Sequence, residues 1–294
     1  MLFSDGTLGT MSAIKGARER ARAEITEAIK EEASRQLAAH GSAGLSLRAV
    51  ARELGMASSA LYRYFPSRDD LLTALIIDAY DAVGEAAERA LAGVDADARD
   101  RAAAAAVAGV KAPATAAPVD RWQAVCGAVR EWAVAHPQEY ALIYGSPVPG
   151  YAAPQTTVGP ASRVPLALVS VVRDAHAAGL LGESAGRPLA EPVRADAVRL
   201  AAELAPELPI RVVAALVAVW AQLFGIVSFE LFGQFNRVVE ARGPFFEQAA
   251  AALAAQVGLA PGDQAGSGRD DAAAAAPSGE PAGAEAARGV LPTE

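Results

Sequence analysis

Hydroxyl and guanidinium side chains gather between residues 46 and 68, within the stretch LSLRAVARELGMASSALYRYFPSRDD. Arginine and tyrosine can donate hydrogen bonds to phosphate oxygens, and small side chains at the start of a helix can reach base edges in a DNA groove. The alternative for each arginine is a solvated surface side chain. We expect DNA contacts from Ser46, Arg48, Ser58, Ser59, Ala60, Tyr62, Arg63, Tyr64 and Arg68.

The apolar residues of this stretch predict two short helices that would carry these side chains. They recur at i, i+3, i+4 and i+7, the spacing of one helix face, at Leu47, Val50, Ala51 and Leu54. Ser46 is expected to cap this helix, Gly55 to end it in a left-handed conformation, and Ser58 to cap a second helix over 59–65. Two short helices joined by a tight turn with glycine form the helix-turn-helix pattern, whose second helix fits the DNA major groove.

Longer helices flank this pair. A helix over about 16–39 has the right position to brace it, which would complete a three-helix unit. Ser67, followed by Asp70, approximates a capping box for a fourth helix over about 68–91. That helix is long enough to enter a second domain, whereas the alanine-rich segment 92–119 is expected to be a loose connection.

Helical periodicity continues to about residue 257, so we expect an all-α fold. A helix capped by Asp120 should end near 136, and the loop 146–160 is too rich in proline and glycine to be helical. The remaining helices are expected at 138–144, 161–178, 192–204, 209–235 and 243–257. The predicted parts are a flexible leader at 1–14, a helix-turn-helix DNA-binding domain at 15–66, a helical ligand-binding and dimerisation domain at 67–259, and a disordered tail at 260–294.

Charge is distributed unevenly along the chain. The net charge of −8 argues against a protein that coats nucleic acid indiscriminately. Residues 12–70, however, contain ten Lys or Arg against eight Asp or Glu, so the positive excess lies with the helix-turn-helix. Phosphate binding would require that location.

Cysteine and histidine are too sparse for metal or redox chemistry. Cys126 is the only cysteine, so no intrachain disulfide can form, and the three histidines are far apart in sequence. No Ser-His-Asp, Cys-His, phosphate-loop or paired-carboxylate pattern has a usable spacing. We therefore expect no enzyme, no metal and no cofactor.

Two segments give information about the cellular location of the protein. The first eleven residues lack the layout of a signal peptide, which favours a cytoplasmic protein. The segment 212–229 has no charge and is long enough to cross a membrane. Because it contains Gln222, Gly225 and Ser228, we favour a helix buried in a bundle or dimer, with a membrane-anchored protein as the alternative.

Aromatic side chains of the second domain could line an apolar ligand pocket with a few polar tips. For any one of them, simple core packing is at least as good an explanation. The loop 146–160 adds weight to the pocket because long ordered loops are often binding elements or lids. The candidate ligand-binding residues are Trp122, Trp132, Tyr140, Tyr144, Tyr151 and His176.

The motif LYRYFPSRDDLL resembles the DNA-binding domain of the TetR family of bacterial regulators, over about residues 23–79, with Tyr64 where the family commonly has histidine. The segments REWAVAHPQEYALIYGSPVPGY and WAQLFGIVSFELFG resemble TetR regulators whose C-terminal domain is named for a Trp-His-Gly motif. Here Phe224 replaces the histidine, which removes any proton or metal role there. The resemblance implies a homodimer formed largely by the last two helices, with Trp220, Phe224, Gly225, Phe229 and Phe232 at the interface or in the domain core.

Together these features favour a homodimeric repressor that a small apolar or amphipathic effector releases from a palindromic, double-stranded DNA operator. The alternative is a constitutive dimeric DNA-binding or architectural protein without an effector. A cavity near Trp132, Tyr144 and His176 would favour the first hypothesis.

Overall fold

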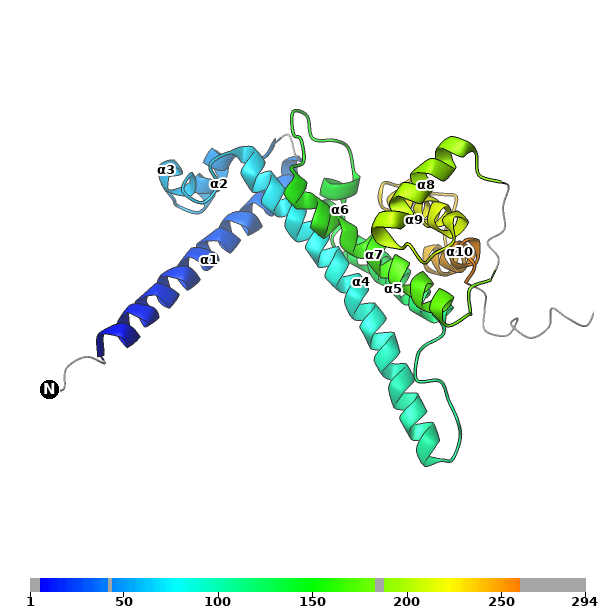
Figure 1. Cartoon of the computed structure of the whole chain (residues 1–294). Coiled ribbons are helices and arrows are strands. Elements are labelled where there is room, and N and C mark those ends of the chain that lie inside the picture. Colours follow the sequence, from blue (N-terminus) through cyan, green and yellow to red (C-terminus); the bar gives the residue numbers. More distant parts are fainter. Residues whose placement is uncertain (1–5, 42–43, 183–187, 260–294) are drawn as a thin grey trace, which may run out of the picture.

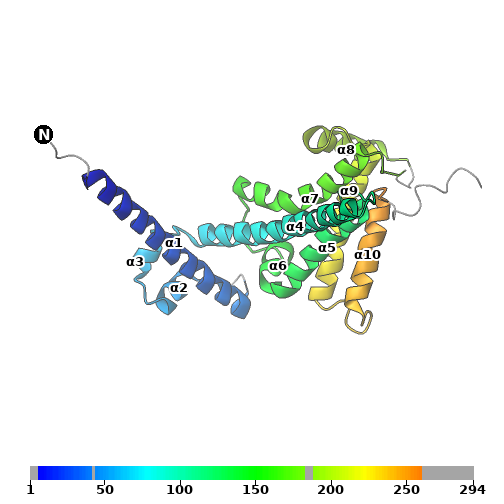
Figure 2. The ribbon, with the colours of Figure 1, turned by 90° about the horizontal axis from the view of Figure 1, so that it is seen from below.

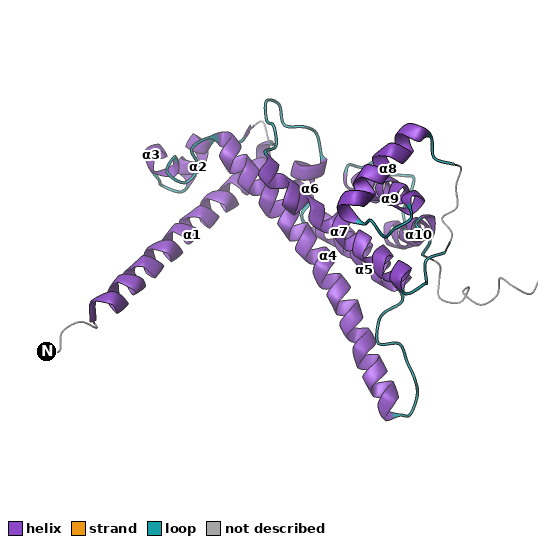
Figure 3. Cartoon of the chain, in the orientation of Figure 1, coloured by secondary structure: helices purple, strands orange, loops and turns teal. Residues whose placement is uncertain are grey.

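The computed structural model describes residues 6–41, 44–182 and 188–259, and these residues form helices without a β-strand (Figures 1 and 3). The predicted all-α fold is confirmed. The helices are α1 (Gly6–His40), α2 (Leu47–Glu53), α3 (Ser58–Leu61), α4 (Arg68–Val107), α5 (Pro118–Ala135), α6 (Pro137–Tyr144), the 3₁₀ turn η2 (Gln155–Thr157), α7 (Val158–Ala177), α8 (Glu191–Leu204), α9 (Ile210–Leu231) and α10 (Arg242–Gln256).

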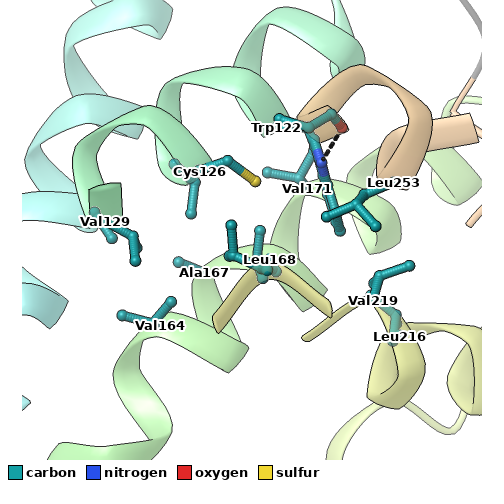
Figure 4. Packing of buried hydrophobic residues seen from close by; sticks show 14 of the residues in the cluster. Trp122, Cys126, Val129, Val164, Ala167, Leu168, Val171, Leu216, Val219 and Leu253 are labelled. Carbon is teal, nitrogen blue, oxygen red and sulfur yellow. Dashed lines mark hydrogen bonds between the residues drawn. The ribbon is translucent and has the colours of Figure 1, made fainter. Parts of the chain in front are cut away.

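Two apolar cores share helix α4. The first core joins α1, α2 and α3 to the start of α4, and its fully buried members include Ile29, Val50 and Leu71. The second core joins the next turns of α4 to α5, α7, α9 and α10. Trp122 of α5 lies at its centre, where the indole N–H donates to the carbonyl oxygen of Ala250 at 3.1 Å (Figure 4).

The helix-turn-helix has the predicted local structure, with two differences. The second helix was expected over 59–65, but α3 ends at Leu61 and residues 62–64 form a turn. The Ser46 side chain caps α2 by accepting from the N–H of Ala49, and Gly55 follows the helix with a φ of 64°. Ser58 was expected to cap the next helix, but the N-cap residue is Ala57 and Ser58 begins α3. That prediction is wrong because Ala57 already has the extended backbone of a cap, which leaves the Ser58 hydroxyl exposed.

Two helices are longer than predicted. Helix α4 starts at the expected Ser67 cap but continues to Val107 instead of ending near 91, so most of the loose connection is helical. Alanine has the highest helix propensity, and the run at 102–106 outweighs the cost of Gly93. Helix α1 begins at Gly6, so residues 6–14 of the expected leader are helical, while residues 1–5 and the predicted tail at 260–294 lie outside the described residues.

Two helices start earlier than predicted, and each has a proline in its first turn. Helix α5 starts at Pro118 after an Ala117 cap, so Asp120 lies in the first turn instead of capping it. The 146–160 segment is only partly loop, because η2 begins at Gln155 and α7 at Val158. Proline is tolerated in a first helical turn, where backbone N–H groups have no partner inside the helix.

Helix α9 is, in the described part of the chain, the helix long and apolar enough to cross a membrane. Its inner side packs in the second core through Val212, Val219 and Val227. Core helices of bundles are also apolar on most of their surface. Of the most apolar window of α9, 39% is buried, which fits a helix with one face in the core and the opposite face exposed.

Candidate DNA interface and effector pockets

Helix α3 and the turn after it, residues 58–64, expose several of the side chains expected to contact DNA. Leu61 is buried in the first core, while Ser58, Ser59 and Arg63 are exposed. Tyr62 is 42% exposed, an unusually high value for a tyrosine with no role at the surface. The short helix therefore has one anchored side and one free polar side.

The residues near α2 and α4 that are expected to contact DNA differ in the exposure of their side chains. Arg48 is exposed, and the capping hydroxyl of Ser46 also reaches the surface. Arg68 is half-buried, and its Nε donates to the carbonyl oxygen of Leu45 at 3.3 Å. Arg68 therefore ties the start of α4 to the segment before α2.

Tyr64 has a partner that the sequence did not suggest. The guanidinium carbon of Arg22, on α1, lies 5.1 Å from the centroid of the Tyr64 ring. Arg22 Nη2 also donates to the carbonyl oxygen of Arg63 at 3.4 Å. No local pattern could reveal this contact, because 41 residues separate Arg22 from Arg63. Tyr64 and Ala60 are only half-exposed, so Tyr62 is the more accessible tyrosine.

Two pockets lie on either side of α6 and the loop that follows it. The first, of about 570 Å³, lies between the end of α1 at Leu37 and Gly41, Tyr144 of α6, and the end of α9 at Ser228 and Phe232. The second, of about 540 Å³, is bounded by α4, the loop, α7 and Trp220. Leu142, Gly145, Ser146 and Val148 line both pockets.

The structure brings only some of the predicted ligand-binding residues together. Tyr144 lines the first pocket and Tyr151 the second, together with Tyr80, which the sequence analysis did not single out. Tyr140 is fully buried beneath them, and its hydroxyl bonds the Phe224 carbonyl oxygen at 3.0 Å. The sequence around Tyr80 does not indicate a pocket, because α4 reaches the pocket only by packing against α6.

The structure does not bring the other three predicted residues, Trp122, Trp132 and His176, to the wall of either pocket. Trp122 is a core residue with its N–H satisfied, as described above. Trp132 is buried and stacks on His136, with ring centroids 5.3 Å apart. His176 lies in the last turn of α7. Core packing, the alternative to ligand binding, accounts for the positions of Trp122 and Trp132, and His176 lies at the end of a helix.

The pocket walls are uncharged, and burial keeps Tyr144 and Tyr80 protonated. Burial, with Tyr80 and Tyr140 nearby, raises the pKa of Tyr144, and burial with Tyr151 nearby raises the pKa of Tyr80. The ring centroids of Tyr144 and Tyr80 are 5.9 Å apart in an edge-to-face pair. Among the residues that the structure describes, no Asp, Glu, Lys, Arg or His lines either pocket. The walls therefore provide apolar surface and neutral hydroxyl groups.

The segment between the pockets, residues 142–151, also packs on the first core. Leu142, Ile143, Val148 and Tyr151 all lie against the apolar residues of the helix-turn-helix unit. The Tyr151 hydroxyl is 2.9 Å from Oγ1 of Thr73, on the second turn of α4. A change in either pocket would therefore act on the helices that carry α2 and α3.

The residues expected at a dimer interface separate into two groups. Phe224 is buried and stacks on Tyr144 at 4.1 Å, so it belongs to the core instead of an interface. Trp220 and Phe232 are part-exposed at the pocket edges, and Gly225 is half-exposed on α9. Phe229 is 51% exposed and lies 5.7 Å, between centroids, from Phe235. The outer aromatic surface thus centres on Phe229, together with Phe245 of α10, itself paired with Phe235.

No cluster of three His, Cys, Asp or Glu side chains capable of holding a metal occurs among the described residues. Cys126 is buried, and burial raises the pKa of its thiol to about 12.

Comparison with known proteins identifies both parts of the chain. Residues 29–75 match the family described as bacterial regulatory proteins, tetR family, and residues 122–253 match the tetracyclin repressor-like C-terminal domain. The HTH-type transcriptional regulator Rv1816 of Mycobacterium tuberculosis is 40% identical over 229 residues, which cover 75% of this chain and 86% of the relative. The regulator Mb1846 of Mycobacterium bovis matches to the same extent.

Solved structures agree with this result. The putative regulatory protein SCO4313 is 32% identical and superposes with a TM-score of 0.56, covering 80% of this chain and 97% of that one. A protein of unknown function from Rhodococcus sp. RHA1 superposes with a TM-score of 0.54 over 81% of this chain and 96% of its own, and its 22% identity supports the fold alone.

Proposed function

Since this chain belongs to the TetR family of bacterial transcriptional regulators, which bind DNA, we propose that it is a homodimeric repressor acting in the cytoplasm. We further propose that a small uncharged, amphipathic effector releases it from a palindromic operator. One observation carries this proposal: the segment that forms the wall of both pockets also packs on the core of the helix-turn-helix.

In the DNA complex, α3 of each subunit would enter a major groove. Two recognition helices of a symmetric dimer must lie about 34–36 Å apart to enter successive major grooves. Ser58, Ser59 and Arg63 would face the bases, and Arg48 and Tyr62 the phosphates. Contacts to phosphates position the protein, whereas contacts to base edges give specificity.

The dimer would form through the outer faces of α9 and α10. Exposed aromatic side chains in contact with one another are uncommon on a monomer and mark interaction surfaces. Phe229 and Phe245 are both exposed, and each ring contacts Phe235, so they provide such a surface. Phe229→Asp is expected to shift the protein toward monomer in analytical ultracentrifugation, and a variant that stays dimeric would contradict this choice of interface.

The effector would change the separation of the two DNA-binding units. An effector that binds the released conformation about 100-fold more tightly supplies about 2.7 kcal/mol of coupling. The first pocket meets the end of α1 and the second meets α4, so an occupant of either would press on a helix of the DNA-binding unit. A charged occupant would lose hydration without gaining a counter-charge, which favours an uncharged compound.

The DNA half is tested by footprinting of the promoter beside the encoding gene, followed by fluorescence anisotropy on the protected site. Arg48→Ala and Tyr62→Phe are expected to weaken binding, whereas Arg89→Ala, an exposed arginine in the middle of α4, should not. Absence of a palindromic protected site would contradict the repressor mechanism.

The effector half is tested with any compound that native mass spectrometry finds in the purified protein. The compound should lower operator affinity for the wild type, and Ser146→Trp, which adds a large ring at a position that lines both pockets, should weaken that effect. The control is Gln123→Trp, which adds the same ring on the exposed side of α5. A compound that binds without changing operator affinity would favour the constitutive DNA-binding protein instead.

A further inference from the structure

The N-terminal part of α1 extends beyond the helix-turn-helix as an exposed helix. The first fully buried residue of α1 is Ile29, and residues 17–25 are all exposed. Figures 1 and 2 both show this half of the helix projecting past α3, away from the C-terminal domain. Tertiary packing usually provides most of the stability of a helix, so such an extension is expected to have a partner outside the monomer.

Charge on α1 changes sign at the point where packing begins. Residues 17–22 contain three arginines and one glutamate, whereas residues 23–32 contain four glutamates and one lysine. Among the described residues, the ion pairs of α1 all lie at Glu27 or beyond, so they leave Arg18 and Arg20 exposed to a partner. Residues 17–24 include alanines but no large apolar residue, which argues against an apolar docking face at this part of α1.

The contacts of Arg22 place this basic segment beside the recognition helix. Arg22 touches both Arg63 and Tyr64, which form the turn directly after α3. Arg18 precedes Arg22 by four residues and so lies on the same side of the helix, one turn farther out. The helix from Arg22 back to Gly6 is about 24 Å long at 1.5 Å per residue.

We propose that the exposed basic part of α1 binds DNA phosphates next to the half-site that α3 occupies, with Arg18 and Arg20 as the contacting residues. The negatively charged DNA backbone complements their charge, and a segment beside the end of α3 meets the backbone outside the base pairs that α3 contacts. Arg22 is a positioning residue, which holds α1 against the turn after α3. This inference rests on the DNA-binding function but not on the effector or on the mode of release.

The test compares wild type, R18A/R20A, R18K/R20K and the control R99A/R101A by anisotropy on the footprinted operator. The control removes the same charge from the far end of α4 (Figure 1). Each lost phosphate contact lowers the slope of log K against log salt by about 0.9, so R18A/R20A should lower it by about 1.8 for each bound subunit. The ratio of the wild-type affinity to the R18A/R20A affinity should then fall by about 12-fold per subunit when the salt concentration rises from about 50 to about 200 mM.

Flanking DNA provides the second measurement. Removing about seven base pairs on each side of the protected site should weaken the wild type, the lysine variant and the control, but not R18A/R20A. Alanine at exposed helical positions preserves the fold, which thermal melting by circular dichroism will verify. The proposal is overturned if R18A/R20A binds the operator with the slope and the flank dependence of the wild type. That result would leave operator binding, and therefore the proposed repressor, intact.

Discussion

Gly84 of α4 lies under Arg163 of α7, and its replacement by alanine tests how closely these helices are joined. A Cβ at Gly84 would lie 2.6 Å from Arg163 Cβ and 2.8 Å from its Cδ. Because Cβ is fixed to the α7 backbone, rotation of the arginine side chain cannot relieve the first contact. The helices would have to separate by about 0.8 Å, from 2.6 Å to the 3.4 Å at which ordinary contact begins.

The expected free-energy change is a balance of three effects. Alanine gains about 1 kcal/mol over glycine within a helix. Overpacking costs about 1–3 kcal/mol. Separation of the helices also weakens the ion pairs of Arg163 with Asp81 at 2.9 Å and Glu88 at 2.7 Å, which are partly exposed and contribute at most about 1 kcal/mol each. We expect Gly84→Ala to lower the free energy of unfolding by about 1–2 kcal/mol.

Gly93 provides the matched control on the same helix. It is exposed, and no atom lies within 4 Å of the position of its Cβ. Gly93→Ala should therefore raise the free energy of unfolding by about 0.5–1 kcal/mol. Urea unfolding followed by circular dichroism measures both variants. In an Arg163→Gly background, which removes the clashing Cβ, Gly84→Ala should become stabilising as well. If Gly84→Ala has the same effect in both backgrounds, the steric argument is refuted.

Three further predictions follow from the same structure. Hydrogen bonds from Arg163 lower the pKa of Glu88. The pair therefore stabilises the fold at pH values above the ordinary carboxyl pKa, and this stabilisation is lost as the pH falls through the lowered pKa. Arg163→Gln should flatten the acid side of the curve of unfolding free energy against pH. Arg130 forms a bidentate pair with the buried Glu230, so Arg130→Ala should cost about 3–5 kcal/mol in urea unfolding, and replacing both residues by methionine should restore most of the loss. Burial raises the pKa of Cys126 to about 12, so thiol reagents should label it only at the rate of unfolding, and fast labelling of the native protein would contradict this.

The helix-turn-helix was predictable because its signals are local. Ser46 and Ala49 are three residues apart, and Gly55 ends the helix through its own backbone conformation. The boundaries of α4 and α5 were less predictable, since they depend on competing local preferences. Gly93 suggested a break, yet the alanines after it continue the helix.

The pockets were predictable only in part, because an aromatic residue has the same appearance in a core and in a binding site. Trp122 belongs to the core through a hydrogen bond to Ala250, 128 residues away. Tyr151 belongs to a pocket wall through contacts with α4, including a bond to Thr73 that spans 78 residues. Such assignments depend on tertiary packing, which no local spacing encodes.

Helix α4 is held by different partners along its length. Beyond Asp81 it packs in the second core through Val83 and Ala87. It is also held there by charge, because Arg163 binds Asp81 and Glu88, and the buried Arg121 of α5 lies 3.2 Å from Asp95. These contacts do not involve a pocket wall. Before Asp81, α4 is held by the segment between the pockets, through the hydroxyls of Thr73 and Tyr151 and the ring pair of Tyr80 and Tyr144.

An effector that moves α6 and its loop can therefore release only the first turns of α4, those that carry the DNA-binding unit. The Thr73–Tyr151 hydrogen bond contributes about 0.5–1.5 kcal/mol and the Tyr80–Tyr144 pair about as much, or about 1–3 kcal/mol together. This range includes the roughly 2.7 kcal/mol that a 100-fold change in operator affinity requires. In the proposed mechanism α4 would pivot near Tyr80, at the boundary between its two sets of partners, while α6 shifts where Tyr140 and Tyr144 meet the second core.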